Sequence, residues 1–379
     1  MNLKFTSGDK IQFSSYTSTA YQFNFVTTQL FRDVSAWYHI VGAVDTTQAT
    51  NTNRVKLYVN GTQVTALDTA TYPSQNANLI MNGNAPYTYL GIYRPTFFYL
   101  NGYLSETIWI DGQQLDATSF GETDTDTGIW KPKAYTGTYG TNGFYLKFAN
   151  SSSLGTDSSG NGNTFTVNNL TSIDQSTDTP TNNFATLNPL NMGTRITLSE
   201  GNLQQSTSAS TSSSCRVAST IAVSSGKWYC EYKASSGTNG LVGIYATTEN
   251  PTDGFIGSTS KSYGYYSNGT KYTNNSGSSY GASWTTNDII GIAFDADNGT
   301  LTFYKNGTSQ GTAFTSIPND FYYFAQGDST NTTWTGQFNF GSPMYSANSY
   351  TDGAGRGNFS YAVPSGYFAL CTANLSLYG

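Results

Sequence analysis

The sequence predicts an all-β protein made of two antiparallel β-sandwiches. Aromatic residues make up 15% of the 379 residues, whereas only 11% are charged. The 29 Tyr and 22 Phe favour strands, and the 39 Gly favour the turns between them. Good helix formers never gather into a run with a period of 3.6 residues. We therefore expect many short strands, with helix limited to short turns, for instance near Asp116–Phe120.

A phrase that occurs twice marks the two sandwiches. Residues 54–64 read RVKLYVNGTQV and residues 300–310 read TLTFYKNGTSQ. Before each copy come a Trp, an apolar strand (Ile40–Val44 or Ile289–Phe294) and an Asp (Asp45 or Asp295). The apolar residues then alternate with polar ones, which predicts antiparallel strands with one buried face. Because Asn-Gly permits positive φ at both turn positions, each copy predicts a three-strand meander closed by a two-residue hairpin.

Charge and cysteine usage exclude several classes of function. The net charge is −6 and the pI is near 4.7, which argues against a nucleic-acid partner. No apolar stretch reaches the roughly 18 residues that a membrane span needs. Three cysteines, Cys215, Cys230 and Cys371, cannot all pair within one chain. We expect buried thiols, with a single bridge as the alternative in an oxidising medium.

The side chains of common catalytic sites are scarce. The one histidine, His39, lies in the apolar strand WYHIVGAV, and we expect it to be a structural residue of a sandwich wall. Asp295 and Asp297 are spaced like a glycosidase pair, but an Asn-Gly turn follows them, so a solvated hairpin tip is favoured. No GxSxG, P-loop or zinc spacing is present. The sequence predicts a protein that is not an enzyme.

Two segments resemble known sandwich families. FRDVSAWYHIVGAVDTTQATNTNRVKLYVNGTQV and the closing strand in 101–122 resemble the concanavalin-A-like, laminin-G-type sandwich. SSGKWYCEYKA, IIGIAFDADNGTLTFYKNG and GQFNFG, within 224–341, resemble a SPRY domain, which is also a concanavalin-like sandwich. This pairing, followed by GYFALCTANL, resembles large structural proteins of marine tailed bacteriophages. The implied divisions are a laminin-G-like sandwich at 1–122, a strand-containing connector at 123–185, a SPRY-like sandwich at 186–342 and a closing segment at 343–379.

The first sandwich is short by comparison with the family that it resembles. Only about 36 residues precede Trp37, and they predict three short strands, Leu3–Phe5, Lys10–Ser14 and Tyr21–Val26. A laminin-G-type sandwich usually has more strands there. Proteins rarely leave such an edge bare, so we expect another chain or the segment 144–167 to cover it. Because phage fibres are often trimers, a homo-trimer is the expected assembly.

A calcium site is one prediction for the turn DSSGNGN at 157–163. This run resembles the turn that opens many laminin-G-type domains and often holds calcium there. Asp157, Asn161 and Asn163 supply the hard oxygen ligands that calcium prefers. The alternative is an ordinary Gly-Asn turn without an ion.

The phage resemblance implies a non-enzymatic virion protein, a tail fibre or surface appendage. It would bind a host-surface glycan or neighbouring tail or capsid proteins, without entering a membrane. Aromatic rings stack on sugars, and the tract 260–284 supplies six candidates: Tyr263, Tyr265, Tyr266, Tyr272, Tyr280 and Trp284. The alternative for these rings is partial burial in sandwich strands. Two other functions stay open: a concanavalin-like glycoside hydrolase, although the Glu-x-Asp-x-x-Glu cluster is missing, and a purely structural decoration protein.

Overall fold

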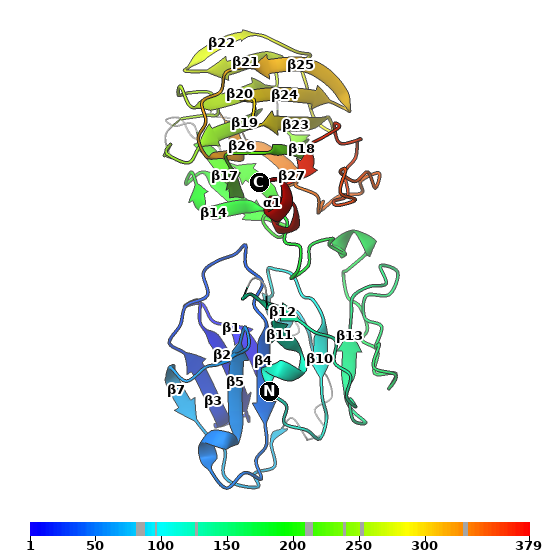
Figure 1. The fold of residues 1–379 in the computed structure, drawn as a ribbon. Coiled ribbons are helices and arrows are strands. Elements are labelled where there is room, and N and C mark those ends of the chain that lie inside the picture. Colours follow the sequence, from blue (N-terminus) through cyan, green and yellow to red (C-terminus); the bar gives the residue numbers. More distant parts are fainter. Residues whose placement is uncertain are drawn as a thin grey trace. The chain divides into compact units, whose positions relative to one another are not determined.

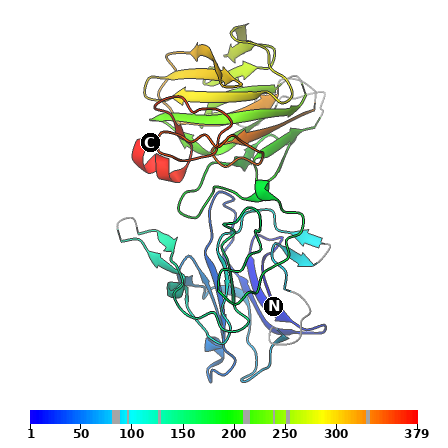
Figure 2. The same cartoon turned by 90° about the vertical axis from the view of Figure 1, so that its right-hand side faces the viewer.

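The chain folds into two compact units, each built from antiparallel sheets (Figures 1 and 2). The first unit comprises Met1–Leu100 and Leu104–Asn169, and the second comprises Asn101–Tyr103 and Leu170–Gly379. The predicted all-β class is confirmed. The first unit includes residues 123–169, which the sequence analysis places in a connector. The computed structural model describes residues 1–80, 88–94, 97–125, 128–208, 215–237, 240–250, 254–328 and 333–379.

The first unit is a sandwich of a four-stranded and a three-stranded sheet. The first three strands and the meander lie where the alternation of the sequence predicts them. The four-stranded sheet has the order β1 (Asn2–Phe5), β2 (Ile11–Tyr16), β3 (Tyr21–Thr27), β7 (Leu67–Thr71), and the three-stranded sheet has the order β4 (Ile40–Val44), β5 (Val55–Val59), β6 (Thr62–Gln63).

Phenylalanine and branched aliphatic residues fill the space between these two sheets. Phe13 and Phe23 are buried with ring centroids 5.0 Å apart, and Leu57 of β5 is fully buried with them. The ring of Phe13 lies against Gly42, where an added Cβ would come within 2.7 Å of it. Strand β2 therefore lies opposite β4 across the core.

A second layer covers the outer face of β4 and β5. Ala43 and Tyr58 are buried there against Ala117, with Trp130 packed beside them. The turn predicted near Asp116–Phe120 is the 3₁₀-helix η3 (Ala117–Ser119). The Asp116 side chain caps its start by accepting a hydrogen bond from Thr118 N (3.0 Å). The remaining elements of this unit are η1 (Asn51–Asn53), β8 (Ile92–Arg94) paired with β9 (Phe97–Tyr99), β10 (Thr107–Trp109) paired with β13 (Phe144–Leu146), η3 (Ala117–Ser119), and β11 (Gly121–Thr123) paired with β12 (Trp130–Pro132).

The second unit is a larger sandwich that contains the second copy of the meander. Asn306 and Gly307 have φ values of 49° and 78°, and Asn60 and Gly61 have 47° and 80°. Both copies thus close with the positive-φ hairpin that Asn-Gly predicts. One sheet has the order β14 (Leu187–Met192), β17 (Cys215–Val223), β26 (Tyr322–Asp328), β19 (Gly240–Ala246), β20 (Ser262–Tyr266), β21 (Thr270–Thr273), β22 (Ser276–Ser279); the other has the order β15 (Ile196–Ser199), β16 (Gln204–Thr207), β27 (Trp334–Asn339), β18 (Lys227–Ser236), β23 (Ile289–Asp295), β24 (Thr300–Lys305), β25 (Thr308–Phe314).

The C-terminal segment 343–379 covers the outer face of the sheet that holds β18 (Figure 2). Phe359 and Cys371 are fully buried there against Tyr229 of β18. The segment contains β28 (Phe368–Ala369), which pairs parallel to β18, and α1 (Thr372–Tyr378), a helix that the sequence analysis does not predict. A 3₁₀-helix, η4 (Ser172–Asp174), lies in the segment before β14.

The glutamate at the middle of β18 ties this segment down. The carboxylate of Glu231 is fully buried and accepts bonds from the backbone N–H groups of Ser360 (2.9 Å) and Tyr361 (3.0 Å) and from the Asn339 amide (3.1 Å). Burial raises the pKa of Glu231, and these donors oppose the rise. One charged side chain thus joins the second sheet to its covering segment.

The three cysteines are buried free thiols, as predicted. Burial raises the pKa of Cys215 to about 11 and raises those of Cys230 and Cys371. None of the helices in the part of the chain that the structure describes is long and apolar enough to cross a membrane.

Candidate functional site

The candidate site is a group of aromatic side chains on the outer face of the seven-stranded sheet. Four lie on neighbouring strands and one lies in the loop before β20. Tyr245 is buried, and the other four are half-buried. We call this group the outer aromatic face; its members are Tyr245 (β19), Phe255, Tyr266 (β20), Tyr272 (β21) and Tyr323 (β26).

Glycines allow the loop with Phe255 to lie directly on the sheet. An added Cβ at Gly264 would come within 2.7 Å of the Ile256 carbonyl oxygen, and one at Gly327 would come within 3.0 Å of Ile256. Gly257 has a φ of 98°, and its N–H donates to the buried Ser262 hydroxyl (2.7 Å). This close approach places the ring of Phe255 5.9 Å from that of Tyr272.

A buried arginine supports the other half of the face. The guanidinium carbon of Arg216 lies 4.1 Å from the ring centroid of Tyr245, a cation–π contact. Arg216 also pairs with Glu249 (3.7 Å), so its charge is compensated within the unit. Tyr245 donates its hydroxyl to Asn191 (3.0 Å), and burial raises the pKa of this phenol, which stays protonated. Its ring lies 5.8 Å from that of Tyr323.

Three of the six predicted stacking residues belong to the core and cannot stack on a ligand. Tyr265 is fully buried 5.2 Å from Phe303, and Tyr263 and Trp284 are 8% and 3% exposed. The reason is the two-residue period of β20, which turns Tyr263 and Tyr265 inward. The Tyr265 hydroxyl donates to the Ala282 carbonyl, and Tyr263 donates to that of Ser260 (3.1 Å), so their polar ends are also used.

The other three predicted residues divide between the core margin and the outer aromatic face. Tyr280 packs 6.0 Å from Phe303, and its hydroxyl both accepts the Phe303 N–H (3.2 Å) and donates to the Gly311 carbonyl. Tyr266 and Tyr272 lie on the outer face with centroids 6.0 Å apart.

Phe255, Tyr245 and Tyr323 are not among the residues that the sequence predicts for this site. In β26, Tyr322 is buried and Tyr323 is half-buried. Adjacent tyrosines in a strand point to opposite faces, so the pair Tyr322–Tyr323 places one ring on the outer face whichever way the strand is turned. Phe255 has no periodic signal, because its place depends on a loop that folds onto glycines.

The residues considered for catalysis have structural roles. His39 accepts a hydrogen bond at Nδ1 from the Trp130 indole (3.1 Å), and burial lowers its pKa, so the neutral ring is favoured. Asp295 is buried and pairs with Lys227 (2.9 Å), which corrects the expectation of a solvated tip. Asp297 is exposed and accepts the Gly226 N–H (2.8 Å).

The turn predicted to hold calcium is closed by hydrogen bonds. The Asp157 carboxylate accepts from Tyr145 N, Ser159 N and Asn163 N (2.9 Å each) and from the Ser159 hydroxyl (2.8 Å). Burial works against the ionised form, but these bonds prevail, so the pKa of Asp157 is lowered. Asn161 and Asn163 donate their amides to the Gly143 carbonyl (2.8 and 2.9 Å).

A calcium ion would have to share the Asp157 oxygens with these donors, so calcium at this turn stays a prediction. Among the described residues, no three His, Cys, Asp or Glu side chains converge as a metal-binding group.

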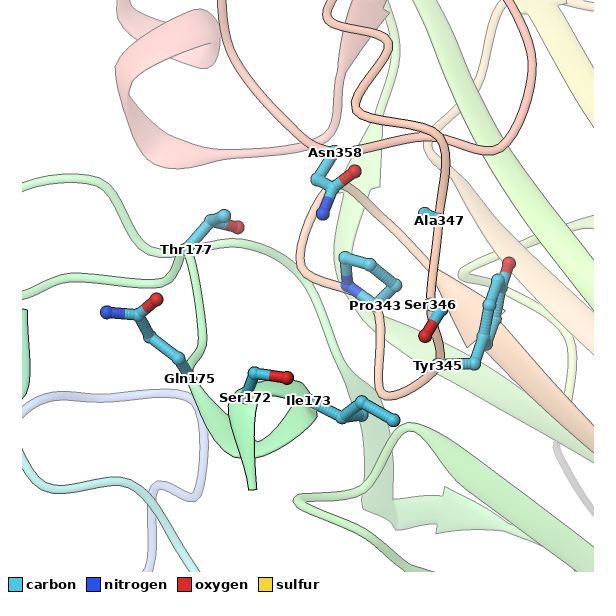
Figure 3. A pocket seen from close by; sticks show the side chains of 9 residues that line it. All are labelled: Ser172, Ile173, Gln175, Thr177, Pro343, Tyr345, Ser346, Ala347 and Asn358. Atoms are coloured by element: carbon cyan, nitrogen blue, oxygen red, sulfur yellow. The ribbon is translucent and has the colours of Figure 1, made fainter. Parts of the chain in front are cut away.

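A small pocket lies between residues 172–177 and the C-terminal segment (Figure 3). It has a volume of about 170 Å³. Ser172 and Ile173 line one side, and Pro343, Tyr345 and Asn358 line the other. No ionised side chain lines it, so it offers hydroxyl and amide groups without acid–base chemistry.

Comparison with known families accounts for both sandwiches. Residues 1–106 match the model of the concanavalin A-like lectin/glucanases superfamily, of the laminin-G type. Residues 227–343 match the SPRY domain. The chain contains a concanavalin A-like domain followed by a SPRY domain. The SPRY match covers β18 to β27 and includes all five residues of the outer aromatic face.

Several proteins that are similar to this chain have names that describe Ran binding. A Ran-binding proteins 9/10 homolog of Drosophila melanogaster is 34% identical over 117 residues, which cover 30% of this chain and 12% of the fly protein. Ran-binding protein 10 of Danio rerio and Ran-binding protein 9 of Homo sapiens are each 34% identical over 113 residues, 29% of this chain and 19% and 16% of those proteins. The chain therefore spans less than a fifth of each relative.

A solved structure of the SPRY domain of human HERC1 is also similar. It is 16% identical, with a TM-score of 0.36, and the match covers 40% of this chain and 96% of that domain.

These findings correct the predicted function. The interpretation as a phage tail fibre or surface appendage that binds host glycans or virion proteins is wrong, because the matched relatives are animal Ran-binding proteins. The predicted virion partners are wrong for the same reason. The expected trimer rested on the phage resemblance alone and loses its basis.

Proposed function

We propose that the chain is a non-catalytic binding protein whose SPRY domain holds a segment of a partner protein on the outer aromatic face. The observation that carries this proposal is the gathering of five aromatic rings, from four strands and one loop, beside the buried Arg216. Tyrosine is among the residue types that dominate binding energy at protein interfaces. Arg216 is fully buried, so it acts by holding Tyr245 in place. Rings already held by packing lose little side-chain entropy when a partner binds.

The charges around the face indicate the chemistry of that segment. Arg216 is paired with Glu249, and no other ionised side chain belongs to the group, so the face offers apolar area and hydroxyl groups. An uncharged segment with one or two bulky apolar side chains fits this surface, because a charged one would lose hydration without a counter-charge.

The relatives support a protein as the ligand. Their names describe binding of the protein Ran, and we take Ran as the first protein probe. Two side chains considered for catalysis are already used within the fold, which supports a non-catalytic role. The Asp295 carboxylate pairs with Lys227, and the neutral His39 accepts a hydrogen bond from Trp130.

Binding should be measured with purified Ran and with a displayed library of random peptides, using the whole chain immobilised. Tyr266→Ala and Tyr272→Ala should weaken the binding of the recognised ligand roughly tenfold or more, the usual size of a hot-spot truncation. The matched control is Tyr350→Ala, which removes a 47%-exposed tyrosine from the C-terminal segment. If neither probe yields a ligand that Tyr272→Ala weakens more than Tyr350→Ala, the proposal is wrong.

A further inference from the structure

The concanavalin A-like domain presents a strand edge that, within the described residues, bonds no other strand. Strand β4 is hydrogen-bonded only to β5. Asp45 N donates to Arg54 O and Asn60 N donates to His39 O, both at 2.8 Å. Because the bonds of an antiparallel ladder alternate, the N–H and C=O groups of Ile40, Gly42 and Val44 point away from β5. Such a row of groups is a template for one more strand.

Apolar side chains on the opposite sheet face the same place. Leu3 and Phe5 of β1 lie directly across from Phe13 and Ile11, so they point to the core side of their sheet. Phe13 and Ile11 are buried, yet Leu3 and Phe5 are 45% and 44% exposed. Phe5 is covered in part by Phe31 and Tyr38, with ring centroids 6.3 Å apart in each pair. Among the described residues, the core thus ends at β1 with Leu3 and the rest of Phe5 open to solvent.

The order of strands shows what is absent opposite β1. Phe13 lies on Gly42, so β2 is opposite β4. Only three residues link β6 to β7, so those two edges lie on the same side of the sandwich. With sheet orders β1-β2-β3-β7 and β4-β5-β6, the position opposite β1 is the one beside β4. One added strand there would pair with β4 and cover Leu3 and the exposed part of Phe5.

The SPRY domain shows the same position filled. Its meander strand β23 corresponds to β4, and β23 is paired with β18 on the side where β4 has no partner. Trp228, Cys230 and Tyr232 of β18 stand opposite Phe294, Ile292 and Ile290, and all three are fully buried. Aligning Asp45 with Asp295 makes Val44, Gly42 and Ile40 the corresponding residues of β4.

We propose that the concanavalin A-like domain takes up a β-strand from a partner polypeptide, antiparallel to β4. The strand carries bulky apolar side chains at every second position, which enter the core over Leu3 and beside the ring group of Phe5, Phe31 and Tyr38, and polar side chains between them. Main-chain bonds to Ile40, Gly42 and Val44 supply the register, and the apolar side chains supply the selectivity. This site is separate from the outer aromatic face, and the proposal does not depend on the proposed function.

The test uses the full chain and a peptide with the sequence of Lys227–Ser236 carrying Cys230→Ser. The control peptide has serine in place of Trp228 and Tyr232. Hydrogen exchange should show the amides of Ile40, Gly42 and Val44 protected at least about tenfold by the first peptide and unchanged by the control. Unchanged exchange of these amides with millimolar first peptide overturns the proposal.

A pair of variants tests the side-chain contacts. Leu3→Ser should weaken the peptide roughly tenfold, because a leucine that is covered only on binding contributes about that factor. Ile80→Ser, at a residue 41% exposed elsewhere in the same unit, should leave the affinity unchanged. Circular dichroism melting confirms that both variants fold. Equal affinities for the two variants overturn the proposed cover over β1.

Two further outcomes exclude a partner as the source of the strand. If the peptide protects β4 only when fused to the chain, the strand is intramolecular. If β4 is protected without peptide in a dimer seen by analytical ultracentrifugation, the occupant is a second copy of the chain. Either result overturns the proposal.

Discussion

The two domains contain the same meander in different surroundings. In the SPRY domain, β23 is bonded to β24 on one side and to β18 on the other, within a sheet that continues through β27, β16 and β15. In the described part of the concanavalin A-like domain, β4 is bonded to β5 alone. The register of both hairpins is continuous, from Ile40↔Val59 to Val44↔Val55 and from Ile290↔Lys305 to Asp295↔Thr300. The meander therefore specifies its own pairing but not its neighbour.

Strand β18 shows how much a neighbour adds. Its inward side chains fill the core, its Lys227 pairs with Asp295 at the end of β23, and its Glu231 holds the C-terminal segment. Asp45, at the position equivalent to Asp295, instead accepts bonds from Gln48 and Thr47 in its own turn. At this position, the first domain has contacts within a loop where the SPRY domain has contacts between strands. We therefore expect the unfolding of the first domain to be less cooperative than that of the SPRY domain.

The largest expected effect is the loss of the Glu231 anchor. Glu231→Ala removes the acceptor of the Ser360 and Tyr361 N–H groups in a buried place and leaves the Asn339 amide with the Asn358 carbonyl alone (2.9 Å). We expect a loss of roughly 2–4 kcal/mol from the unfolding free energy of the SPRY domain, since each unsatisfied buried donor costs about 1–3 kcal/mol. Urea unfolding followed by SPRY-domain amide signals measures it, and signals of the first domain should not move.

The pH dependence of this loss gives a second check. Burial raises the pKa of Glu231 above its ordinary value of 4.5, so its stabilising contribution is complete below pH 4.5 and declines as the pH rises through the folded-state pKa. The difference between wild type and Glu231→Ala should thus be larger at pH 4.5 than at pH 8. The exposed Glu200→Gln is the control. A difference that grows with pH would mean that the bonds to Glu231 outweigh its burial and that its folded-state pKa is not raised.

Much of the fold could be predicted from the sequence because the signals are local. Alternation and Asn-Gly turns place β1 to β5 and the β23–β24 hairpin within one or two residues of the observed bounds. The helix α1 has no such signal, since its seven residues form on a surface that β18 and the C-terminal segment make together. Local patterns do not specify which strands become neighbours. The pairing of β18 with β23, and the absence of an equivalent strand beside β4 among the described residues, could therefore not be predicted from the sequence.

The site was less predictable than the fold. The sequence predicts Tyr266 and Tyr272 as stacking residues together with Tyr265 and Trp284, because composition does not show which side of a strand faces the core. Phe255 reaches the face only through a loop that lies on Gly264 and Gly327. The overall arrangement of the two sandwiches led to a phage function, which the relatives contradict; shared folds do not specify function.

The next largest effect concerns Gly42 of β4, which stands where the equivalent strand of the SPRY domain, β23, has a core side chain. Gly42 stands where β23 carries Ile292, and the space is filled from the opposite sheet by Phe13. Gly42→Ala places a methyl 2.7 Å from the Phe13 ring and should cost about 1–3 kcal/mol of unfolding free energy in the first domain. Gly8→Ala, whose nearest added contact is 3.9 Å away, should change it by less than about 0.5 kcal/mol.

A double variant shows whether Phe13 is the cause. Phe13→Leu combined with Gly42→Ala should cost less than the sum of the two single changes, because the smaller side chain makes room for the methyl. Additive losses would mean that Gly42 is required for another reason, and the correspondence with Ile292 would lose its physical basis.

The smallest expected effect concerns the ionisation of the two aspartates at the ends of the equivalent strands, Asp45 after β4 and Asp295 of β23. Burial works against ionisation of Asp295, but bonds from Asn298 and Lys227 prevail, so its pKa is lowered from 3.8. The stability from this group is therefore present above pH 3.8 and is lost as the pH falls through the folded-state pKa. Lys227→Met should raise the pKa of Asp295 and cost about 0.5–1 kcal/mol at pH 7, a modest value because Lys227 is partly exposed. The cost should shrink toward zero at pH 3.

Carbon-detected NMR titration of the aspartate carboxyls gives the comparison directly. The pKa of Asp45 is lowered by the Gln48 amide and by Thr47, so Gln48→Ala should raise it while Lys227→Met leaves it unchanged. Conversely, Gln48→Ala should not affect Asp295. If Lys227→Met shifted both aspartates, or neither, the ionisation of Asp295 would not depend on β18. The contrast between a strand end held by its neighbour and one held by its own turn would then be wrong at this position.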